Sequence, residues 1–493
     1  MKPEITERDY LDALRCPKLL WLNQCKKEAA AAQSTDGSAM TFQSEVRALA
    51  EQLFPGCVRV PPESLSERIR ETEILPNRST QVLGNASFRL EQLCCTADYL
   101  KTDGRTIELY GVRSSLSVHA SHLDVLAYQT FVLRKCGYSV KKITLVHLNR
   151  SYVREDALDL SQLFVFEDVT KPVLSRQKKT EGNIQQLRSI LTQDSEPVQD
   201  LSEACRTGIV CPYFSRCTHM LEQPNVFSLR HTQQRTIFEY YRKGIITYAQ
   251  LLEDGSLNRH ARMQVEYELC DKEPHIEAEP ILAFLNGLQR PISFLDFEAF
   301  QPPLPLYAHS SPYAQIPFQY SLHIQKHRNA PAEHREFLAD PDEDPRRPLA
   351  ERLIQDIPSY GTVLAWNMEF ERSRIRELES LFPDLARELE QIRNRIRDLI
   401  VPFEKKWYYC REMNGSGSIK SVLPALFPDH PDLNYENLEA IHAGQEAAAA
   451  FLHMKEMNPE TRAKTQKELL DYCGLDTRAM VLILNRLYEI TGQ

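Results

Sequence analysis

The chain has 493 residues, of which 26% are charged and 42% hydrophobic, and its formal net charge is −9. This length is too great for one compact core, so we expect two or three domains. The charge excludes a chromatin-like polycation. It does not exclude a nucleic-acid enzyme, since the carboxylates that bind divalent metal make a site locally acidic. Composition alone therefore leaves the function open.

The sequence contains no apolar run of about 18 residues or more, so it predicts no membrane-spanning helix. Its first residues, MKPEITERDYLDALRCPK, lack the apolar segment of a secretory signal. We therefore expect a cytoplasmic protein without a membrane partner.

The first half of the chain alternates helical and strand-like segments. In chain order, helices are predicted over 5–30 and 41–54, strands over 92–100 and 106–113, a helix over 120–137 and a strand over 143–148. This α-β-β-α-β order is typical of a mixed sheet flanked by helices, so the expected fold class is α/β. A polar stretch over 171–204 leads from these elements to a group of cysteines.

The second half follows a helical segment, 226–288, that we expect to link two globular halves. A strand is predicted from Ile292, followed by a proline-rich loop. The later predictions are strands at 315–325 and 362–366 and helices at 347–356, 368–398, 436–456 and 460–490. Strands again alternate with helices, which indicates a second α/β domain.

Two acidic residues alternate in the predicted strand ISFLDFEAF. Asp296 and Glu298 are two residues apart, so both side chains point to the same face of a sheet. On an otherwise apolar strand these two carboxylates repel each other unless a cation lies between them. A sheet-edge strand with solvated acids is the alternative for this pattern.

A third acid follows the next buried strand, in TVLAWNMEFERSRI. The strand ends near Trp366, Asn367 is a good helix N-cap, and Glu371 then lies one turn into the helix. This spacing places a carboxylate just beyond a strand end, where the sites of α/β proteins gather. Glu369 is the neighbouring alternative, and either acid alone also suits a helix N-terminus.

The last predicted helix carries a tyrosine and an acid in LLDYCGLDTRAMVLIL. Tyr472 and Asp476 are four residues apart, so they share one face of the helix. The tyrosine hydroxyl can then lie beside a metal-bound water that the carboxylate helps to hold. A core tyrosine next to a surface acid is the alternative.

Together, these three motifs resemble the DnaQ-like DEDD exonucleases in their tyrosine variant, from about Pro291 onward. The resemblance implies an RNase H-like fold and metal-dependent removal of nucleotides from the 3′ end of DNA, or of RNA. It implies two Mg²⁺ or Mn²⁺ ions and an attacking water positioned by Tyr472. The carboxylates that it assigns to the metal ions are those of Asp296, Glu298, Glu371 and Asp476.

One residue departs from the pattern of this family, and two others are candidate substrate contacts. Glu371 departs from the family pattern, because the wider superfamily usually has aspartate there; glutamate still reaches a metal ion, but the spacing of the metals can differ. Asn367 and Lys420, the latter in the loop GSGSIK, are candidate substrate contacts. An ordinary surface lysine is the alternative for Lys420.

The segments ERDYLDALRCPKLLWL, CTADYL, IELYGVRSS, DVLAYQTFVL and VHLNRSYVR resemble the RecB-like branch of the PD-(D/E)xK nucleases, which have a restriction-endonuclease-like fold. In that family an aspartate and an acid-x-lysine pair bind the metal ion. Asp98 and Gln129 match the family, but Gly111 and Arg113 stand at the acid and lysine positions. Glu108 cannot replace the missing acid, because it points to the opposite face of the strand. We therefore expect an inactive lobe that holds DNA or acts as a scaffold.

Four cysteines match a further feature of the RecB-like exonucleases. The segment ACRTGIVCPYFSRC places Cys205, Cys211 and Cys217 at two equal spacings of six, and Cys16 lies far upstream in RCPKLLW. In those enzymes one N-terminal and three C-terminal cysteines hold a 4Fe-4S cluster, which ties the ends of the domain together. A zinc ion bound by four cysteines, or plain buried thiols, are the alternatives.

The whole chain resembles a bacterial family of uncharacterised proteins that joins these two kinds of nuclease domain. The expected division is a RecB-like lobe over 1–225, a helical linker over 226–288 and a DnaQ-like lobe over 289–493. We expect a 3′–5′ exonuclease whose partner is nucleic acid with a 3′ end. The alternative is a non-catalytic nucleic-acid-binding or assembly protein that retains both folds as scaffolds.

Overall fold

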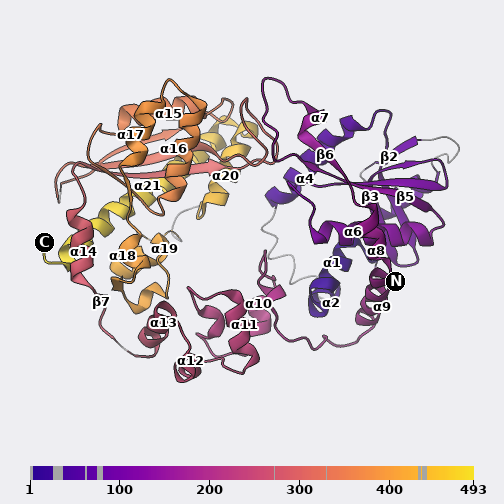
Figure 1. Cartoon of the computed structure of the whole chain (residues 1–493), viewed down its shortest axis with the longest axis horizontal. Coiled ribbons are helices and arrows are strands. Elements are labelled where there is room, and N and C mark those ends of the chain that lie inside the picture. Colours follow the sequence, from indigo (N-terminus) through magenta and orange to yellow (C-terminus); the bar gives the residue numbers. More distant parts are fainter. Residues whose placement is uncertain are drawn as a thin grey trace. The chain divides into compact units, whose positions relative to one another are not determined.

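The computed structural model describes residues 4–25, 37–61, 64–74, 81–270, 272–328, 330–430, 433, 435 and 441–493. The chain forms two compact units, each with helices and a sheet (Figure 1). Unit 1 comprises Met1–Met220 and Pro302–Ala314, and unit 2 comprises Leu221–Gln301 and Gln315–Gln493. The chain is therefore a mixed α/β protein, as expected. Among the described helices, none is both long and apolar enough to cross a membrane.

Unit 1 is built on a six-stranded mixed sheet with the strands in chain order. The strands are β1 (Val58–Arg59), β2 (Gln81–Leu90), β3 (Leu93–Thr102), β4 (Thr106–Val112), β5 (Ser139–Leu148) and β6 (Phe164–Asp168). The β2–β3–β4 meander is antiparallel, and β4 and β5 pair in parallel through helix α6 (Ala120–Lys135). Sequence analysis predicted β3, β4, α6 and β5 but missed β2, whose tight turn to β3 has Glu91 at φ +55°.

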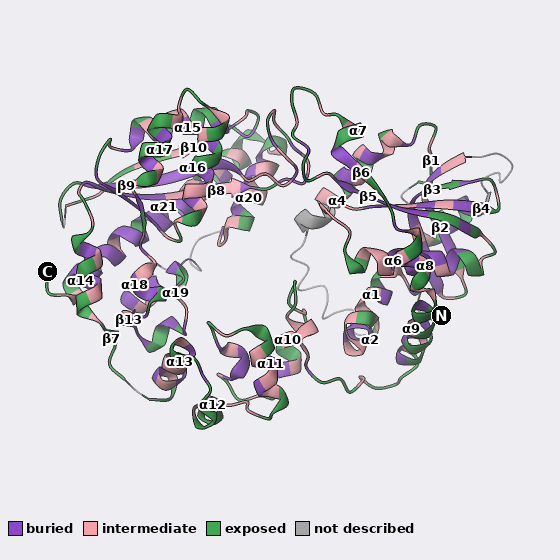
Figure 2. Cartoon of the chain, in the orientation of Figure 1, coloured by how far each residue is buried: buried purple, intermediate pink, exposed green. Residues whose placement is uncertain are grey.

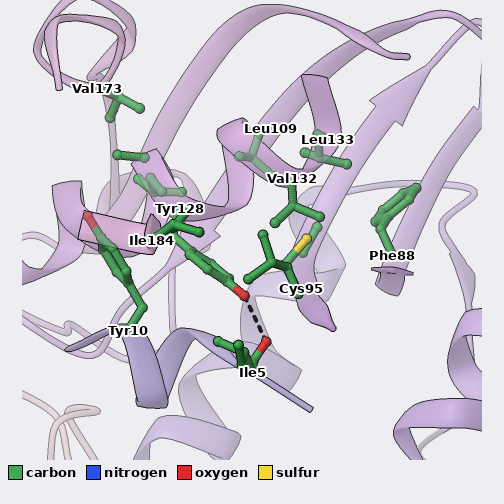
Figure 3. Packing of buried hydrophobic residues seen from close by; sticks show 14 of the residues in the cluster. Ile5, Tyr10, Phe88, Cys95, Leu109, Tyr128, Val132, Leu133, Val173 and Ile184 are labelled. Atoms are coloured by element: carbon green, nitrogen blue, oxygen red, sulfur yellow. Dashed lines mark hydrogen bonds between the residues drawn. The ribbon is translucent and has the colours of Figure 1, made fainter. Parts of the chain in front are cut away.

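Helices cover both faces of the unit 1 sheet. One face packs against α1 (Glu7–Arg15), α2 (Pro17–Cys25), α6 and α9 (Gln177–Leu191). The other face packs against α4 (Gly37–Ala50). Figure 3 shows the first core, in which the buried Tyr128 hydroxyl donates a hydrogen bond of 2.7 Å to the carbonyl of Ile5. The helix predicted over 5–30 is interrupted at Cys16, and 26–36 lie outside the described residues.

The segment Pro302–Ala314 belongs to unit 1, although its neighbours on both sides belong to unit 2. The backbone of Arg154 exchanges hydrogen bonds with Ser310 and His309, and its guanidinium donates to the carbonyls of Pro305 and Leu306. Leu304 and Tyr313 pack against the core under α4. The proline-rich loop is thus an integral part of the first unit.

Unit 2 contains a five-stranded mixed sheet with the order β10-β9-β8-β11-β12. The strands are β8 (Ile292–Phe300), β9 (Ile316–Gln325), β10 (Glu333–Leu338), β11 (Thr362–Ala365) and β12 (Ile396–Asp398). The first three form an antiparallel meander, whereas β11 and β12 run parallel to β8. Figure 2 shows that the central strands of this sheet are mostly buried.

Helices lie on both faces of this second sheet. On one face, α15 (Arg346–Asp356), α16 (Glu369–Leu381) and α17 (Ala386–Asn394) pack over Leu295 and Phe297. The long helix α21 (Pro459–Ile490) packs against β8 and β9 on the other side of the strands (Figure 1). The single helix predicted over 368–398 is wrong: α16 ends before Pro383, which cannot continue the hydrogen-bond ladder, and the remainder forms α17 and β12.

The helical segment predicted over 226–288 belongs to unit 2. It contains α11 (Gln234–Arg242), α12 (Tyr248–Asp254), α13 (Arg259–Leu269), β7 (His275–Ile276) and α14 (Ala278–Asn286). Strand β7 pairs with β13 (Tyr408–Tyr409). Gln264 of α13 also bonds to the carbonyl of Asn414, so two parts of the unit that are far apart in sequence are joined.

Candidate metal centre and cysteine cluster

Three carboxylates meet on the α21 side of the unit 2 sheet. Asp296 and Glu298 extend from alternate positions of β8, and Asp476 comes from α21. One carboxylate oxygen of each lies within 4.8 Å of the other two. Among the described residues, no other group of three histidine, cysteine or acidic side chains is drawn together so closely. Oxygen ligands at this spacing suit Mg²⁺ or Mn²⁺.

Helix α21 is held in place by a row of polar side chains on β9. The Gln319 amide donates to the carbonyl of Leu469 at 2.7 Å, and the Ser321 hydroxyl lies 2.6 Å from that of Thr477. In the β8–β9 register, Gln319 is opposite Glu298 and Ser321 is opposite Asp296. The strand therefore brings the acids of β8 and the anchors of α21 to the same face, which sets Asp476 beside Asp296.

Glu371 lies close to this trio but is not one of the three that meet within 4.8 Å. It occupies the first turn of α16, is buried, and its Oε2 has no hydrogen-bond partner. Burial first, and then neighbouring charges that include Glu371, raise the pKa of Asp296. Burial first, and then the charges of Asp398 and Glu298, raise the pKa of Glu371. Glu371 is thus a fourth carboxylate at the edge of the same site.

The approach to Glu371 differs from the predicted helix cap. Asn367 has a left-handed backbone with φ +68°, and Met368 is the N-cap of α16. The backbone N–H groups of Asn367 and Met368 donate to the carboxylate of Asp398 at 3.0 and 3.1 Å. Asp398 at the end of β12 therefore fixes the start of the helix that carries Glu371. The sequence analysis placed Asp398 at the end of the helix predicted over 368–398 and did not predict this role.

The four carboxyl groups hold their protons more tightly than free acids do. Burial, followed by the charge of Asp476, raises the pKa of Glu298 to about 8, and burial raises that of Glu371 to about 8. Burial also raises the pKa of Asp476 to about 6 and that of Asp296 well above its ordinary value. Without a cation these groups repel one another, so a bound divalent ion would lower the pKa of each.

Two tyrosines border the carboxylates. Tyr472 is buried, and the charges of Asp476, Glu298 and Asp296 all raise its pKa after burial, so its hydroxyl lies in their field. Tyr435 donates a hydrogen bond of 2.6 Å to Oδ1 of Asp476. Sequence analysis predicted Tyr472 from its spacing to Asp476 but had no signal for Tyr435, whose partner is 41 residues away.

Lys420 and Cys473 complete the surroundings of the acids. The Lys420 ammonium lies 5.5 Å from the ring centre of Tyr472 and donates to the carbonyl of His442. Its charge lowers the pKa of both Glu298 and Asp476 against the effect of burial. The thiol of Cys473 lies 3.6 Å from Oδ2 of Asp296. Lys420 is thus exposed but close to the site.

In unit 1, the predicted metal ligand Asp98 is bound by two arginines of the protein itself. Asp98 is buried and forms ion pairs with Arg113 at 2.7 Å and with Arg47 at 2.9 Å. Its Oδ2 also accepts the backbone N–H of Val112 at 2.8 Å. Two guanidinium groups and one amide therefore satisfy this carboxylate, as a metal ion would.

The other two positions singled out by the predicted RecB-like pattern, Gly111 and Gln129, are also enclosed by protein groups. A Cβ at Gly111 would lie 3.0 Å from Leu126 Cδ2, so the sheet leaves little room for an acidic side chain there. The amide of Gln129 donates to Glu7 Oε1 at 3.1 Å and to the carbonyl of Thr96 at 2.8 Å. Gln129 thus holds Glu7, a half-buried acid in helix α1 that sequence analysis had not singled out.

The four predicted cysteines come together in unit 1. Cys16 lies between α1 and α2, Cys205 ends a short 3-10 helix (Glu203–Cys205), and Cys217 lies in α10 (Phe214–Thr218). The backbone N–H of Cys211 donates to the carbonyl of Cys205 at 2.8 Å. Burial first, and then Cys16 and Cys205, raise the pKa of both the Cys211 and Cys217 thiols, so the four sulfurs are electrostatic neighbours.

The chain is similar to a protein domain and to a protein whose functions are both unknown. Residues 293–418 match the model of a domain of unknown function, DUF2779. An uncharacterized protein of Mycoplasma genitalium, MG366, is 26% identical over 218 residues, which are 40% of this chain and 32% of that protein. The match thus spans about a third of the relative's length. The matched domain contains Asp296, Glu298, Glu371 and Asp398 but not Asp476.

Proposed function

We propose that unit 2 is a metal-dependent 3′–5′ exonuclease that hydrolyses phosphodiesters, with DNA as the preferred substrate class and RNA as the alternative. The observation that carries this proposal is the meeting of Asp296, Glu298 and Asp476 within 4.8 Å, with buried Glu371 beside them. Buried acids without a cationic partner are costly unless they are protonated or bind a metal ion. The site has the composition that metal-assisted phosphoryl hydrolysis requires.

The arrangement of the sheet supports the same proposal. An antiparallel meander, β8 to β10, followed by two strands parallel to β8, is compatible with an RNase H-like fold. The acids lie on the central strand, on the helix after β11 and on the last helix, as the resemblance to DEDD exonucleases requires. Asp296, Glu298 and Asp476 would bind the metal ions, and Glu371 would complete the set.

Each surrounding group has a role in the proposed hydrolysis. Two bound Mg²⁺ or Mn²⁺ ions would supply charge that favours attack of water on phosphorus and departure of the 3′ oxygen. The Tyr472 hydroxyl orients the attacking water, and Tyr435 holds the Asp476 carboxylate by its hydrogen bond. Lys420 supplies positive charge at the rim of the site, where the phosphate backbone of the substrate approaches.

The direct test is Asp296→Ala with 5′-labelled single-stranded DNA and Mn²⁺. We expect a loss of about 100- to 1,000-fold in 3′-end degradation, because a strand carboxylate that holds metal acts mainly on the transition state. Binding of the same DNA should be largely retained. The matched control is Asp471→Ala, which removes an exposed acid on the same helix as Asp476. Parent-like degradation by Asp296→Ala would move the protein to the non-catalytic binding class.

For unit 1 we propose a 4Fe-4S cluster on Cys16, Cys205, Cys211 and Cys217. Within the described part of the chain, no three cysteine sulfurs lie within 4.8 Å of one another. A zinc ion with bonds of about 2.3 Å would hold its four sulfurs about 3.8 Å apart. The four cysteines would hold the cluster through their thiolates, and iron and zinc analysis of the purified protein distinguishes it from a zinc ion.

A further inference from the structure

Two guanidinium groups enclose the carboxylate of Asp98, and Glu7 is a further acid within the electrostatic reach of that carboxylate. Arg47 and Arg113 share this one carboxylate, so the group of three retains a net charge of one positive unit. The Arg47 side chain is 41% exposed, whereas that of Asp98 is only 6% exposed. The positive charge of the group is therefore presented to solvent and the negative charge is enclosed.

Both guanidinium groups retain donors beyond those that bind Asp98. Arg113 uses a single nitrogen, Nη1, for its bonds to Asp98 and to the carbonyl of Val112. Arg47 binds Asp98 through Nη2, while its Nε is buried and has no hydrogen-bond partner. Each guanidinium has five N–H donors in a planar fork that matches the oxygens of a phosphate group.

The amino-terminal turn of α6 extends this set of donors. The His122 ring lies in the field of Arg113 and of His119, which precedes the helix. Its Nδ1 accepts the backbone N–H of His119 at 3.2 Å, so the neutral ring carries its proton on Nε2 and can donate it. The helix dipole adds positive potential at the same end of the helix.

Protein side chains prevent the same place from binding a divalent cation. Both oxygens of Asp98 are bonded to cationic or amide donors, and Gly111 provides no second ligand. A cation would have to displace two arginines and would meet their repulsion. An anion meets neither obstacle.

We propose that Arg47, Arg113 and the first turn of α6 bind one phosphate group of a nucleic-acid strand without a metal ion. The two guanidinium groups would provide the positive charge that a metal ion provides in an active RecB-like nuclease. This site lies in unit 1 and is independent of the hydrolysis proposed for unit 2. It gives the chain a second contact with the strand, one that binds and does not cut.

The experiment measures binding of a short fluorescent single-stranded DNA to the full-length protein in EDTA, by anisotropy at several salt concentrations. Arg47→Gln should weaken binding about tenfold and reduce the salt slope by about one unit, because one phosphate contact is lost. Arg188→Gln is the matched control: Arg188 is 39% exposed, pairs with Glu91, and also has a buried Nε without a partner. Equal affinity of the two variants would overturn the proposal.

Asp98→Asn tests whether DNA binding depends on the arginines or on the carboxylate between them. Asparagine preserves the shape and the bond to Val112 but removes the negative charge, so DNA should bind as tightly as to the parent or more tightly. A loss of binding in Asp98→Asn would show that the strand needs the carboxylate itself and not only the arginines, and would refute the proposal. Arg113 is the more enclosed of the two arginines, with a side chain 14% exposed against 41% for Arg47, so Arg113→Gln alone can unfold the unit. Arg113 is therefore tested in the Asp98→Asn/Arg113→Gln double variant, which should again bind about tenfold more weakly than Asp98→Asn.

Two further binding measurements distinguish an internal phosphodiester from a terminal phosphate as the bound group. If the site takes an internal phosphodiester, a 5′-phosphate on the oligonucleotide should leave the effect of Arg47→Gln unchanged. If it takes a terminal phosphate, the 5′-phosphorylated strand and deoxythymidine monophosphate should both bind more tightly to the parent than to Arg47→Gln. The absence of any variant effect in both arms would exclude a phosphate site here. All arms omit divalent metal and cleavage, so they stand apart from the nuclease test.

Discussion

Single side chains give the carboxylate sites of the two units different electrostatic surroundings. In unit 2, Asp296, Glu298 and Asp476 face one another, and the cation Lys420 at the rim lowers the pKa of Glu298 and Asp476 against the effect of burial. In unit 1, Asp98 is enclosed by two arginines. A buried carboxylate needs a cationic partner in either case. The acids of unit 2 therefore need a cation from outside the chain, whereas Asp98 in unit 1 already has two arginines as partners.

Glu371→Asp tests whether the fourth carboxylate is a metal ligand. The change restores the residue usual in DEDD exonucleases and shortens the side chain by one methylene. We expect the Mn²⁺-dependent rate to be retained or raised, whereas Glu371→Gln should lower it about 100-fold, since the charge is lost. Single-turnover degradation of end-labelled DNA measures both. Equal rates for Gln and Glu at this position would remove Glu371 from the site.

Tyr472→Phe should have a smaller effect than the loss of a carboxylate. It removes one hydroxyl from the field of three acids and leaves the packing of the ring unchanged. We expect a rate lowered about 10-fold, in line with the loss of one oriented hydrogen bond. The control is Tyr488→Phe on the same helix, whose ring faces Arg290 and Arg328 instead. Comparable losses in both variants would point to a structural effect.

Asp98→Ala should leave the nuclease rate unchanged, because Asp98 is bound by arginines and Gly111 offers no second carboxylate. The measured quantity is again Mn²⁺-dependent degradation from the 3′ end. Introducing the missing acid by Gly111→Glu should destabilise unit 1 by about 1–3 kcal/mol, since the new Cβ would lie 3.0 Å from Leu126. A large loss of activity in Asp98→Ala would show that unit 1 takes part in cleavage.

At the scale of elements, the pairing of β9 with α21 decides where Asp476 lies. Gln319, Ser321 and His323 occupy alternate positions of β9, and all three bond to α21. Because the side chains of a strand alternate between faces, these anchors share the face of Asp296 and Glu298. A shift of the helix along the strand would carry Asp476 away from the other acids.

Thr477→Val should lower the nuclease rate about 3- to 10-fold while retaining the fold. It removes hydrogen bonds of 2.6 and 2.8 Å to Ser321 and His323, each worth about 1 kcal/mol, next to Asp476. Thr465→Val is the matched control, since Thr465 is also buried on α21 but bonds to Met457. Kinetics with varied Mn²⁺ distinguish the two: only Thr477→Val should raise the metal concentration needed for half-maximal rate.

At the scale of the whole molecule, the proposed cluster joins the ends of unit 1. Cys16 precedes the sheet and Cys205, Cys211 and Cys217 follow it, so four bonds to one cluster would close a long loop. The Arg15 guanidinium already bonds to the carbonyls of Ala204 and Ile209, which draws the same two segments together. Metal binding at such a closure contributes directly to the free energy of folding.

Protein purified without oxygen should therefore be brown and contain about four irons per chain. Cys205→Ser should lose the colour and lower the unfolding temperature of unit 1, whereas Cys270→Ser, a change at an exposed cysteine of unit 2, should alter neither. Iron and zinc analysis together with visible spectroscopy provides the measurement. Colourless parent protein with one zinc per chain would replace the cluster by a zinc site.

The sequence by itself determined the features that depend on local periodicity. A spacing of two puts Asp296 and Glu298 on one strand face, and a spacing of four puts Tyr472 and Asp476 on one helix face, whatever the rest of the chain does. Only the tertiary structure decided which faces meet. It brought Tyr435 to Asp476, Asp398 to the start of α16 and Arg47 to Asp98. Those partners lie tens of residues apart, and no local pattern records a contact that arises only when packed elements bury their apolar faces together.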